Sequence, residues 1–393
     1  MLYYISHSAV EKEERGNQLQ VKLSFEYVSK KIPVVGIFLS GKKKIYTKIQ
    51  HAGNKYIIDY NTCFDWIEKI LGIISFKKNI TPSLFAFKSS KIIKKDTQEK
   101  DVYLRIFSLI DGIFFIKRMN KFKIRKLACE FHDIDYKLPM YKKNIDRIFR
   151  KYIFKSFIKH AVNAGEKVTL VTVSHTLAEQ FSKEFSYPYK IAVIPNGHNF
   201  EHLEPKNKYS FGNDHIKIIY TGLNLYKMKG LNHLIEALDF LDHRFLVHII
   251  GGTDAHRNEL NQKYKKFVAQ KRLIIDPPKN HQEMIGYMQK ADLAVIPLPK
   301  NDFSLFTSPL KLFEYMAAGL PIVASDVPTI KEVINDRQDG LLYEAGDVHS
   351  MVQMIKILVS HKSLAETIGK GAYRTSKNYT YEKRAERILE IFN

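Results

Sequence analysis

The stretch SPLKLFEYMAAGLPIVASD, residues 308–326, joins a helix signal to a strand signal. Ser308 is a suitable helix N-cap, and Pro309 suits the first helical position, where its missing N–H has no cost. Gly319 suits the left-handed position that ends a helix. The run Pro321–Ala324 is typical of a short buried strand. The stretch therefore predicts a helix that leads at once into a buried strand.

One residue in this helix needs an explanation. Glu314 lies on the same helical face as Leu310, Ala317 and Ala318, which are small or apolar. A carboxylate is seldom buried on such a face unless it has a partner. Glu314 is either a binding residue, or a structural residue that pairs with a nearby Lys or turns toward solvent.

The second half of the chain alternates strands with helices, which predicts a parallel sheet covered on both faces. The expected strands are Ile216–Thr221, Phe245–Gly251, Leu273–Asp276, Leu293–Pro297, Pro321–Ser325 and Gly340–Tyr343. The expected helices are Gly230–Leu241, Asn258–Gln270, His281–Lys290, Pro309–Ala318 and Val348–Leu358.

The first half repeats this alternation less regularly, with a helix expected over Asn17–Lys30. Its expected strands are Leu2–Ser6, Val34–Ser40, Tyr56–Tyr60, Val102–Ile106, Leu127–Phe131, Thr169–Val173 and Ala192–Pro195.

The predicted architecture is two doubly wound, Rossmann-like α/β domains that face each other across a cleft, with ligands at the carboxyl ends of the strands. The polar stretch 199–215, broken by Pro205 and Gly212, is interpreted as the linker. We expect a first domain over 1–200 and a second over 201–378. Residues 379–393 are expected to form a helix that returns to the first domain.

The two cysteines, Cys63 and Cys129, indicate a reducing compartment rather than a disulfide framework. The N-terminus lacks the pattern of a signal peptide, and no apolar run is long enough to span a membrane, so a soluble or peripheral protein is expected. Positive charge is concentrated in residues 1–200, which hold 36 Lys and Arg against 18 Asp and Glu; the remainder holds 26 against 23. This asymmetry indicates an anionic partner for the first half.

Residues 140–161 place basic residues among aromatic and aliphatic ones at helical spacing. The basic residues are Lys142, Lys143, Arg147, Arg150, Lys151, Lys155 and Lys159. This pattern is typical of a helix on an anionic membrane surface, and equally of a core helix with a solvated basic face. The charge excess of the first half favours the membrane interpretation.

The segment YTGLNLYKMKG, residues 220–230, predicts an anion site where a strand gives way to a loop and a helix. Lys227 and Lys229 would add positive charge for a phosphate, although a solvated loop with surface lysines is the plain alternative. The N-terminus of the helix near Ser308–Leu310 would supply further N–H groups to a diphosphate. Glu314, one turn deeper, could accept hydrogen bonds from the two hydroxyls of a ribose.

With these segments in place, the chain resembles a family 4 glycosyltransferase of the GT-B architecture. The likeness rests on YTGLNLYKMKGLNHLIEAL, on ADLAVIPLP followed by SPLKLFEYMAAGLPIVASD, and on KEVINDRQDGLLYEAGD. In the first half, ACEFHDID, VTVSHTLAE and VIPNGHNF resemble family segments in the same order.

The resemblance implies roles for individual residues. Lys229 matches the basic residue on the donor diphosphate, and Glu314 matches the glutamate that holds the donor ribose. His132 matches the histidine that reaches toward the transferred sugar and the acceptor. The donor-binding set it implies is Gly16, Gly222, Lys227, Lys229, Ser308, Pro309, Leu310 and Glu314.

Three departures from the family pattern affect the donor. Phe306 stands where a first glutamate beside the donor sugar is usual. Leu223 and Asn224 stand where a basic residue often follows Gly222, and the turn at Gly16 has one glycine where many relatives have two. The stretch around residues 308–326 therefore indicates the type of reaction better than it indicates which sugar is transferred.

The implied activity is transfer of a sugar from a nucleotide diphosphate sugar with retention of configuration, without a metal or other cofactor. A basic acceptor domain fits a lipid-linked glycan at the inner face of the cell membrane, in the assembly of a surface polysaccharide. Asp133 and Asp135 form a DxD, but paired Asp after a strand are common in turns, so no metal is predicted.

Two alternatives remain from the residues. One is a nucleic-acid-binding protein on a Rossmann-like scaffold, which would explain the basic surface but not Glu314. The other is a nucleotide-sugar epimerase of the same fold, which needs an acid–base pair that the sequence does not reveal. GxGxxG after the first strand and GxxxxGK[ST] are both missing, which counts against a nicotinamide or flavin enzyme and an ATPase.

Overall fold

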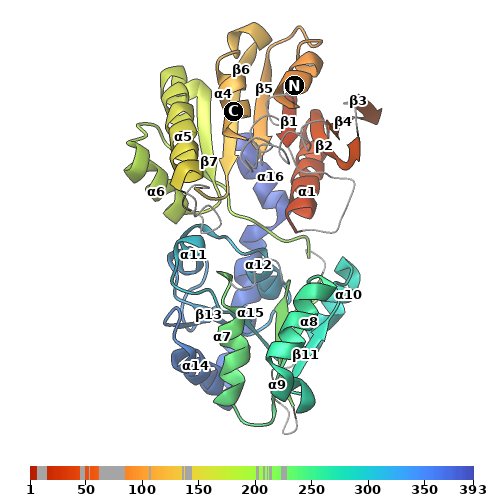
Figure 1. Ribbon diagram of the computed structural model, residues 1–393, viewed down its shortest axis with the longest axis vertical. Helices are drawn as coiled ribbons and strands as arrows, with labels where there is room; N and C mark the ends of the chain where they lie inside the picture. The colour runs from red at the N-terminus through yellow and green to blue at the C-terminus, as the bar shows by residue number, and fades with distance from the viewer. Residues whose placement is uncertain are drawn as a thin grey trace. The chain divides into compact units, whose positions relative to one another are not determined.

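Two parallel sheets form the framework of the computed structural model, one in each of two units (Figure 1). The first unit comprises Met1–Pro195 and Tyr381–Asn393, and the second comprises Asn196–Thr380. The structure describes residues 1–6, 16–44, 49–52, 54–61, 85–105, 108–134, 137, 144–200, 203–206, 209, 211, 215–222 and 228–393. The predicted fold class, two doubly wound α/β domains, is confirmed.

The sheet of the first unit has the order β3-β4-β2-β1-β5-β6-β7-β8, and only the β3–β4 pair is antiparallel. Its strands are β1 (Leu2–Ser6), β2 (Val34–Lys44), β3 (Ile49–Ala52), β4 (Lys55–Asn61), β5 (Lys100–Arg105), β6 (Ile124–Phe131), β7 (Val168–Thr172) and β8 (Ala192–Val193). Its helices are α1 (Gly16–Lys31), α4 (Leu109–Ile116), η1 (Asn120–Phe122), α5 (Asn144–Ala164), η3 (Gly165–Lys167), α6 (His175–Phe185) and α16 (Tyr381–Glu390).

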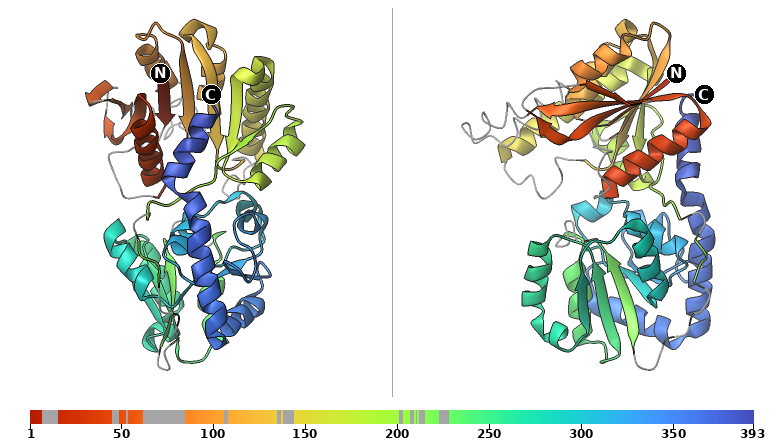
Figure 2. Two further views of the ribbon diagram at one scale, coloured as in Figure 1. Left: turned by 180° about the vertical axis from the view of Figure 1, so that it is seen from behind. Right: turned by 90° about the vertical axis from the view of Figure 1, so that its right-hand side faces the viewer.

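Helix α16 is an integral part of the first unit although it follows the second unit in the chain. Ala385 and Ile388 lie in the same buried cluster as Tyr4 and Tyr103 of the central strands. Figure 2 shows this helix, drawn in blue, running alongside the first unit's sheet near α1. The core of this unit is thus assembled from both ends of the described chain.

The sheet of the second unit is wholly parallel, with the order β11-β10-β9-β12-β13-β14. Its strands are β9 (Ile216–Thr221), β10 (Phe245–Ile250), β11 (Leu273–Asp276), β12 (Leu293–Ile296), β13 (Ile322–Ser325) and β14 (Leu341–Tyr343). Its helices are α7 (Leu231–Glu236), η5 (Ala237–Asp239), α8 (Asp254–Lys263), α9 (Lys265–Ala269), α10 (His281–Lys290), α11 (Asp302–Phe306), α12 (Leu310–Ala317), α13 (Pro328–Lys331), α14 (Val348–Ser360), α15 (Lys362–Ser376) and η6 (Lys377–Tyr379).

Described parts of the segment 199–215 pack into the second unit, so the interpretation of this stretch as a polar linker is wrong. Phe200, Leu203 and Tyr209 are buried, and the first two join an apolar cluster that includes Leu312 of α12. The hydroxyl of Tyr209 donates to the carbonyl of Gly319 at 3.1 Å. Widely spaced apolar residues in this stretch anchor the chain despite its polar composition.

Candidate functional site

The strand order of the second unit locates a switch point between β9 and β12. The chain winds outward from β9 to β11, then returns to β12 on the other side of β9 and winds outward again. Ligands of doubly wound sheets bind outside the carboxyl ends of the strands at such a point. The residues of interest are therefore those that follow Thr221 and Ile296.

Helix α12 follows β12 and presents its N-terminus near this switch point. Its N-cap is Pro309, in an extended conformation with φ −75° and ψ 121°, so the expectation of Ser308 as N-cap is wrong by one residue. Ser308 contributes its carbonyl instead, which accepts from Nδ2 of Asn196 at 3.0 Å. The helix ends at Ala317 with Ala318 as its C-cap, and Gly319 takes the expected left-handed conformation with φ +66°.

Tyr315 ties α12 to the end of β9. Its hydroxyl accepts from the backbone N–H of Thr221 at 2.8 Å and lies 3.1 Å from the Thr221 hydroxyl. Tyr315 is completely buried, so this link is shielded from water. The link fixes the first turns of α12 over the point where the loop after β9 departs.

Glu314, beside Tyr315, is half-buried, and its carboxylate has no hydrogen-bond or ion-pair partner among the described residues. Burial raises the pKa of this carboxyl to about 7, and the positive charge of Lys311 opposes the rise. The carboxyl therefore changes charge near neutral pH. An unpaired carboxyl at the switch point is free to accept hydrogen bonds from a ligand.

Lys311 lies near this carboxyl, and a second lysine, Lys229, lies near Lys311. Lys311, one turn before Glu314, has its ammonium nitrogen 3.3 Å from the centroid of the Tyr220 ring. Burial and the charge of Lys229 hold the pKa of Lys311 well below its usual range, while Glu314 opposes this effect. Burial also lowers the pKa of Lys229, which immediately precedes Gly230. We call Lys229, Lys311 and Glu314 the Lys311 cluster.

The two glycines of the loop after β9 differ in their surroundings. Gly230 has φ +70°, and a Cβ there would lie 1.7 Å from the carbonyl oxygen of Pro297. Only glycine lets the start of α7 approach the end of β12 this closely. Gly222 has φ +77° with open space around it, and its N–H donates to the carbonyl of Ile250 at 2.7 Å. Lys227, predicted to bind phosphate, lies outside the described residues.

Phe306 occupies the end of α11 and is buried at 2% exposure. It lies among the apolar core residues of the second unit rather than presenting a polar group. The position at which the resemblance implies a glutamate beside the donor sugar is therefore an apolar packing position in this chain.

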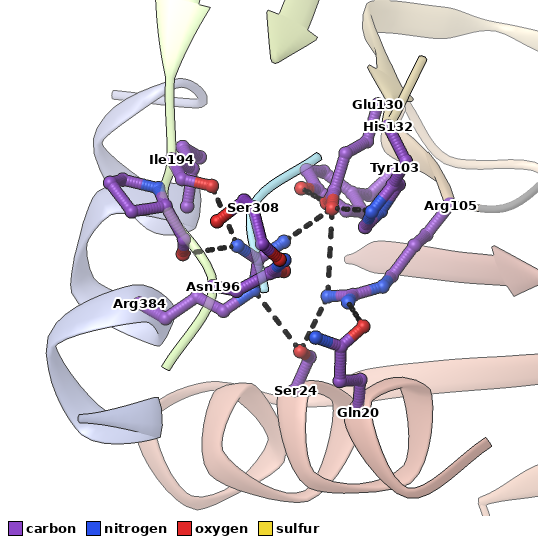
Figure 3. Close-up of polar contacts among 11 residues, drawn as sticks. Gln20, Ser24, Tyr103, Arg105, Glu130, His132, Ile194, Asn196, Ser308 and Arg384 are labelled. Carbon is purple, nitrogen blue, oxygen red and sulfur yellow. Dashed lines mark hydrogen bonds and ion pairs between the residues drawn. The ribbon is translucent and has the colours of Figure 1, made fainter. Parts of the chain in front are cut away.

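In the first unit, buried charges meet at the carboxyl ends of the central strands (Figure 3). Glu130, completely shielded at its carboxylate, lies 2.5 Å from Nη2 of Arg384 and 3.7 Å from Nη1 of Arg105. The hydroxyl of Tyr103 donates to its other oxygen. The arginines hold the pKa of Glu130 well below its usual range, against the opposing effect of burial. We call Tyr103, Arg105, Glu130, His132 and Arg384 the Glu130 network.

His132 lies at the rim of this network, directly after β6. Its Nε2 is 2.8 Å from Oε1 of Glu130, and its side chain is 27% exposed. Burial lowers the pKa of His132, and the two arginines add to this effect, while Glu130 opposes it. The imidazole is therefore neutral at pH 7. Gly16, also predicted for the donor site, is the first residue of α1 in the same unit.

Only some of the basic residues predicted over 140–161 lie on the exposed face of α5. Arg147, Lys151 and Lys155 are exposed, together with Ile148 at 68% and Tyr152 at 71% exposure. Arg150, predicted on the same surface, is buried at 7% exposure, because it lies on the inward side of the helix. Lys142 and Lys143 lie outside the described residues.

Four charged residues of these clusters were missed as candidates from the sequence, as was Tyr103. Lys311 lies within the SPLKLFEYMAAGLPIVASD motif but has no role implied by it, and Glu130 lies within the ACEFHDID segment, where only His132 has an implied role. Arg105 and Arg384 gave no local signal. A charged residue inside an otherwise apolar strand, as in LACEF, is the signal that could have drawn attention to Glu130.

Neither a metal site nor a membrane span emerges from the described part of the chain. No three His, Cys, Asp or Glu side chains gather there as metal ligands, and Asp135 of the DxD lies outside it. Across the same residues, no helix has both the length and the apolar character that crossing a bilayer requires.

The fold is that of the GT-B glycosyltransferases, as solved structures of similar architecture show. Residues 215–361 match the family model described as Glycosyl transferases group 1, and this match lies within the second unit. Sucrose-phosphate synthase from Thermosynechococcus elongatus has a similar structure, with a TM-score of 0.77 at 15% identity over 100% of this chain and 98% of the other. The Anabaena protein HepE in complex with UDP has a TM-score of 0.65 at 12% identity over 100% and 99%.

Sequence relatives point the same way. An uncharacterised glycosyltransferase of Methanocaldococcus jannaschii is 25% identical over 60% of this chain and 62% of its own length. A lipopolysaccharide core biosynthesis mannosyltransferase of Rhizobium meliloti is 29% identical over 35% of this chain and 38% of its own length. The chain thus spans less than two thirds of the length of these relatives.

Proposed function

We propose that this protein is a glycosyltransferase that moves a sugar from a nucleotide diphosphate sugar to a lipid-linked or glycan acceptor in surface polysaccharide assembly. The observation that carries the proposal is the unpaired Glu314 carboxyl near Lys311, which in turn lies near Lys229, at the switch point of the second unit. The group 1 family match over the same unit supports the donor class. The polysaccharide context is supported by the lipopolysaccharide mannosyltransferase among the relatives.

The proposed reaction retains the anomeric configuration and needs no metal or other cofactor. The bond between the anomeric carbon and the diphosphate oxygen breaks, and its electron pair leaves with the diphosphate. The acceptor oxygen bonds to the same face of the anomeric carbon, and its proton passes to the departing phosphate oxygen. Lys229 and the N–H groups at Ser308, Leu310 and the start of α12 stabilise the charge that develops on the diphosphate.

The remaining predicted residues take supporting roles in this proposal. Glu314 accepts from the ribose hydroxyls, and Gly16, Gly222 and Pro309 let backbone groups approach the donor. Neutral His132 reaches toward the transferred sugar and the acceptor. The first unit binds the acceptor, and Arg147, Lys151 and Lys155 hold it against an anionic membrane at the inner face of the cell membrane.

A thermal-shift panel of UDP-, GDP- and ADP-sugars tests the proposal. A ligand that binds only the folded state raises the unfolding midpoint, and the nucleotide that does so identifies the donor class. No shift with any nucleotide sugar at millimolar concentration would contradict the proposal. If the protein is retained on heparin and nucleotide sugars do not release it, the nucleic-acid-binding alternative is favoured.

A further inference from the structure

Lys311 is an unusual lysine because its ammonium group is buried without a hydrogen-bond partner among the described residues. Lysine is seldom buried without a partner, since burying an unpaired ammonium costs several kcal/mol. The ring of Tyr220 offers a cation–π contact at 3.3 Å, which recovers only part of this cost.

The charged neighbours of Lys311 act in opposite directions, since Lys229 adds to the cost of burial and Glu314 offsets part of it. The second cation of the cluster, Lys229, repels it, and the carboxyl of Glu314 is itself unpaired and close to neutral. Two cations held side by side in a half-buried place attract a ligand with at least two negative charges. A diphosphate has such charges on adjacent phosphoryl groups.

The backbone around Lys311 also favours a bound anion. Lys311 lies in the first turn of α12, where the early N–H groups lack intrahelical partners and the helix dipole favours anions. Tyr315, one turn further along α12, bonds to Thr221 at the end of β9, so the helix that carries Lys311 is anchored at the switch point.

We propose that Lys311 is a second diphosphate-binding cation, which with Lys229 grips the donor on the side of α12. This inference rests on the proposed function, since it assigns one more binding residue to the same site. Without ligand, Lys311 is a buried charge that destabilises the fold. With a diphosphate bound, it gains the counter-charge that it lacks.

The test compares Lys311→Met with wild type, using Lys265→Met as a matched control. Lys265 is an exposed lysine on α9 of the same unit. The probes are inorganic pyrophosphate, and a nucleoside monophosphate and diphosphate of the base selected in the nucleotide-sugar panel. Met fills nearly the same volume without the charge, so the variant without ligand is expected to have an unfolding midpoint equal to or above that of wild type.

Wild type and Lys265→Met are expected to bind the nucleoside diphosphate more tightly than the monophosphate. Lys311→Met is expected to lose roughly ten- to hundred-fold of diphosphate affinity, as for a charge-assisted hydrogen bond, with little change for the monophosphate. Pyrophosphate should stabilise wild type but not Lys311→Met. Lys311→Gln keeps a hydrogen-bond donor without the charge, and should behave like Met.

Two results would overturn the inference. One is a Lys311→Met variant that keeps the diphosphate preference and the pyrophosphate shift. The other is a large fall of its unfolding midpoint with unchanged ligand affinities, which would make Lys311 a structural cation on Tyr220. The proposed function fails separately, when wild type responds to pyrophosphate but to no nucleotide.

Discussion

Arg384 of α16 and Glu130 of β6 form a buried ion pair, with Nη2 2.5 Å from Oε1, across 254 positions of the chain. The same guanidinium donates from Nη1 to the carbonyls of Ile194 and Pro195. Arg384 therefore links the end of Met1–Pro195, the longer of the two segments of the first unit, to the carboxylate of Glu130 in the sheet of that unit. Both side chains are almost fully buried, so the pair is screened very little by solvent.

Glu130→Gln is expected to destabilise the first unit by roughly 3–5 kcal/mol, because it leaves Arg105 and Arg384 buried without a counter-charge. Urea unfolding at pH 7, followed by a probe in the first unit, measures the loss. Glu386→Gln is the control: Glu386 lies on the same helix but pairs with Lys31 at the exposed surface. Equal effects of the two substitutions would contradict a special role for the buried pair.

The contribution of Glu130 should depend on pH in a defined direction. Its folded pKa lies well below the unfolded value near 4.5, so the folded state binds fewer protons than the unfolded state as the pH falls. The stabilisation is complete above about pH 4.5 and is lost as the pH falls toward the folded pKa. The difference between wild type and Glu130→Gln should therefore shrink on acidification.

Glu314→Gln should show the opposite pH dependence. The folded pKa of about 7 exceeds the unfolded value of 4.5, so wild type loses stability as the pH rises between these values. The variant lacks this loss, and at pH 8 it should be more stable than wild type by about 1–3 kcal/mol. Thermal unfolding at pH 4, 6 and 8 measures the effect, and an unchanged difference across the series would refute it. The same variant should bind nucleotides more weakly, because an amide is a poorer acceptor for ribose hydroxyls.

Gly230→Ala and Gly222→Ala form a matched pair of substitutions at positive φ. At Gly230 the new methyl group meets the carbonyl of Pro297, so the variant should lose on the order of 3 kcal/mol or more. At Gly222 there is open space, so only the backbone strain of about 1–2 kcal/mol remains. Thermal unfolding of the second unit compares them. If both variants unfold at the same temperature, the close approach of α7 to β12 does not exist in solution.

The exposed face of α5 should bind anionic vesicles. Replacing Arg147, Lys151 and Lys155 with Ala should weaken binding on the order of a hundredfold, at about 1 kcal/mol for each basic residue. The double substitution Ile148→Ser and Tyr152→Ser should weaken the part of binding that persists at high salt, since it removes the exposed apolar contacts. Flotation with phosphatidylglycerol vesicles at low and high salt measures both.

The control for α5 is Ile274→Ser, which removes an exposed aliphatic side chain from the second unit. Flotation that is unchanged in the α5 variants, or that is missing for wild type at low salt, would refute a membrane role for this face.

The fold was largely predictable because local patterns determine its strands. Strands β1, β9 and β11 begin and end where their apolar runs predicted. Short helices were missed: α11 and α13 contain five and four residues, too few to show helical periodicity. Helix α15 was also missed, because its buried positions are filled largely by Ala, Gly and Ser.

Residues of the site were predictable only where they belong to a sequence motif. Lys229 and Glu314 were found through the segments that contain them, and their roles stay predictions. Arg384 could not be connected with Glu130, since no local pattern links residues that the fold alone brings together. Lys311 was overlooked for a similar reason. A lysine in the first turn of a helix is ordinarily solvated, and only the packing against Tyr220 reveals its isolation.

The discontinuity of the first unit has a consequence for how the protein is made. Residues 196–380 form a continuous unit that can fold as soon as it leaves the ribosome. The first unit is synthesised earlier but lacks α16, and with it the counter-ion of Glu130, until residue 384 has emerged. The usual order of domain folding during synthesis, N-terminal first, is thus reversed. During translation the first 195 residues are an incomplete domain in which the apolar surface that α16 covers is exposed, and this nascent state is where dependence on chaperones should be greatest.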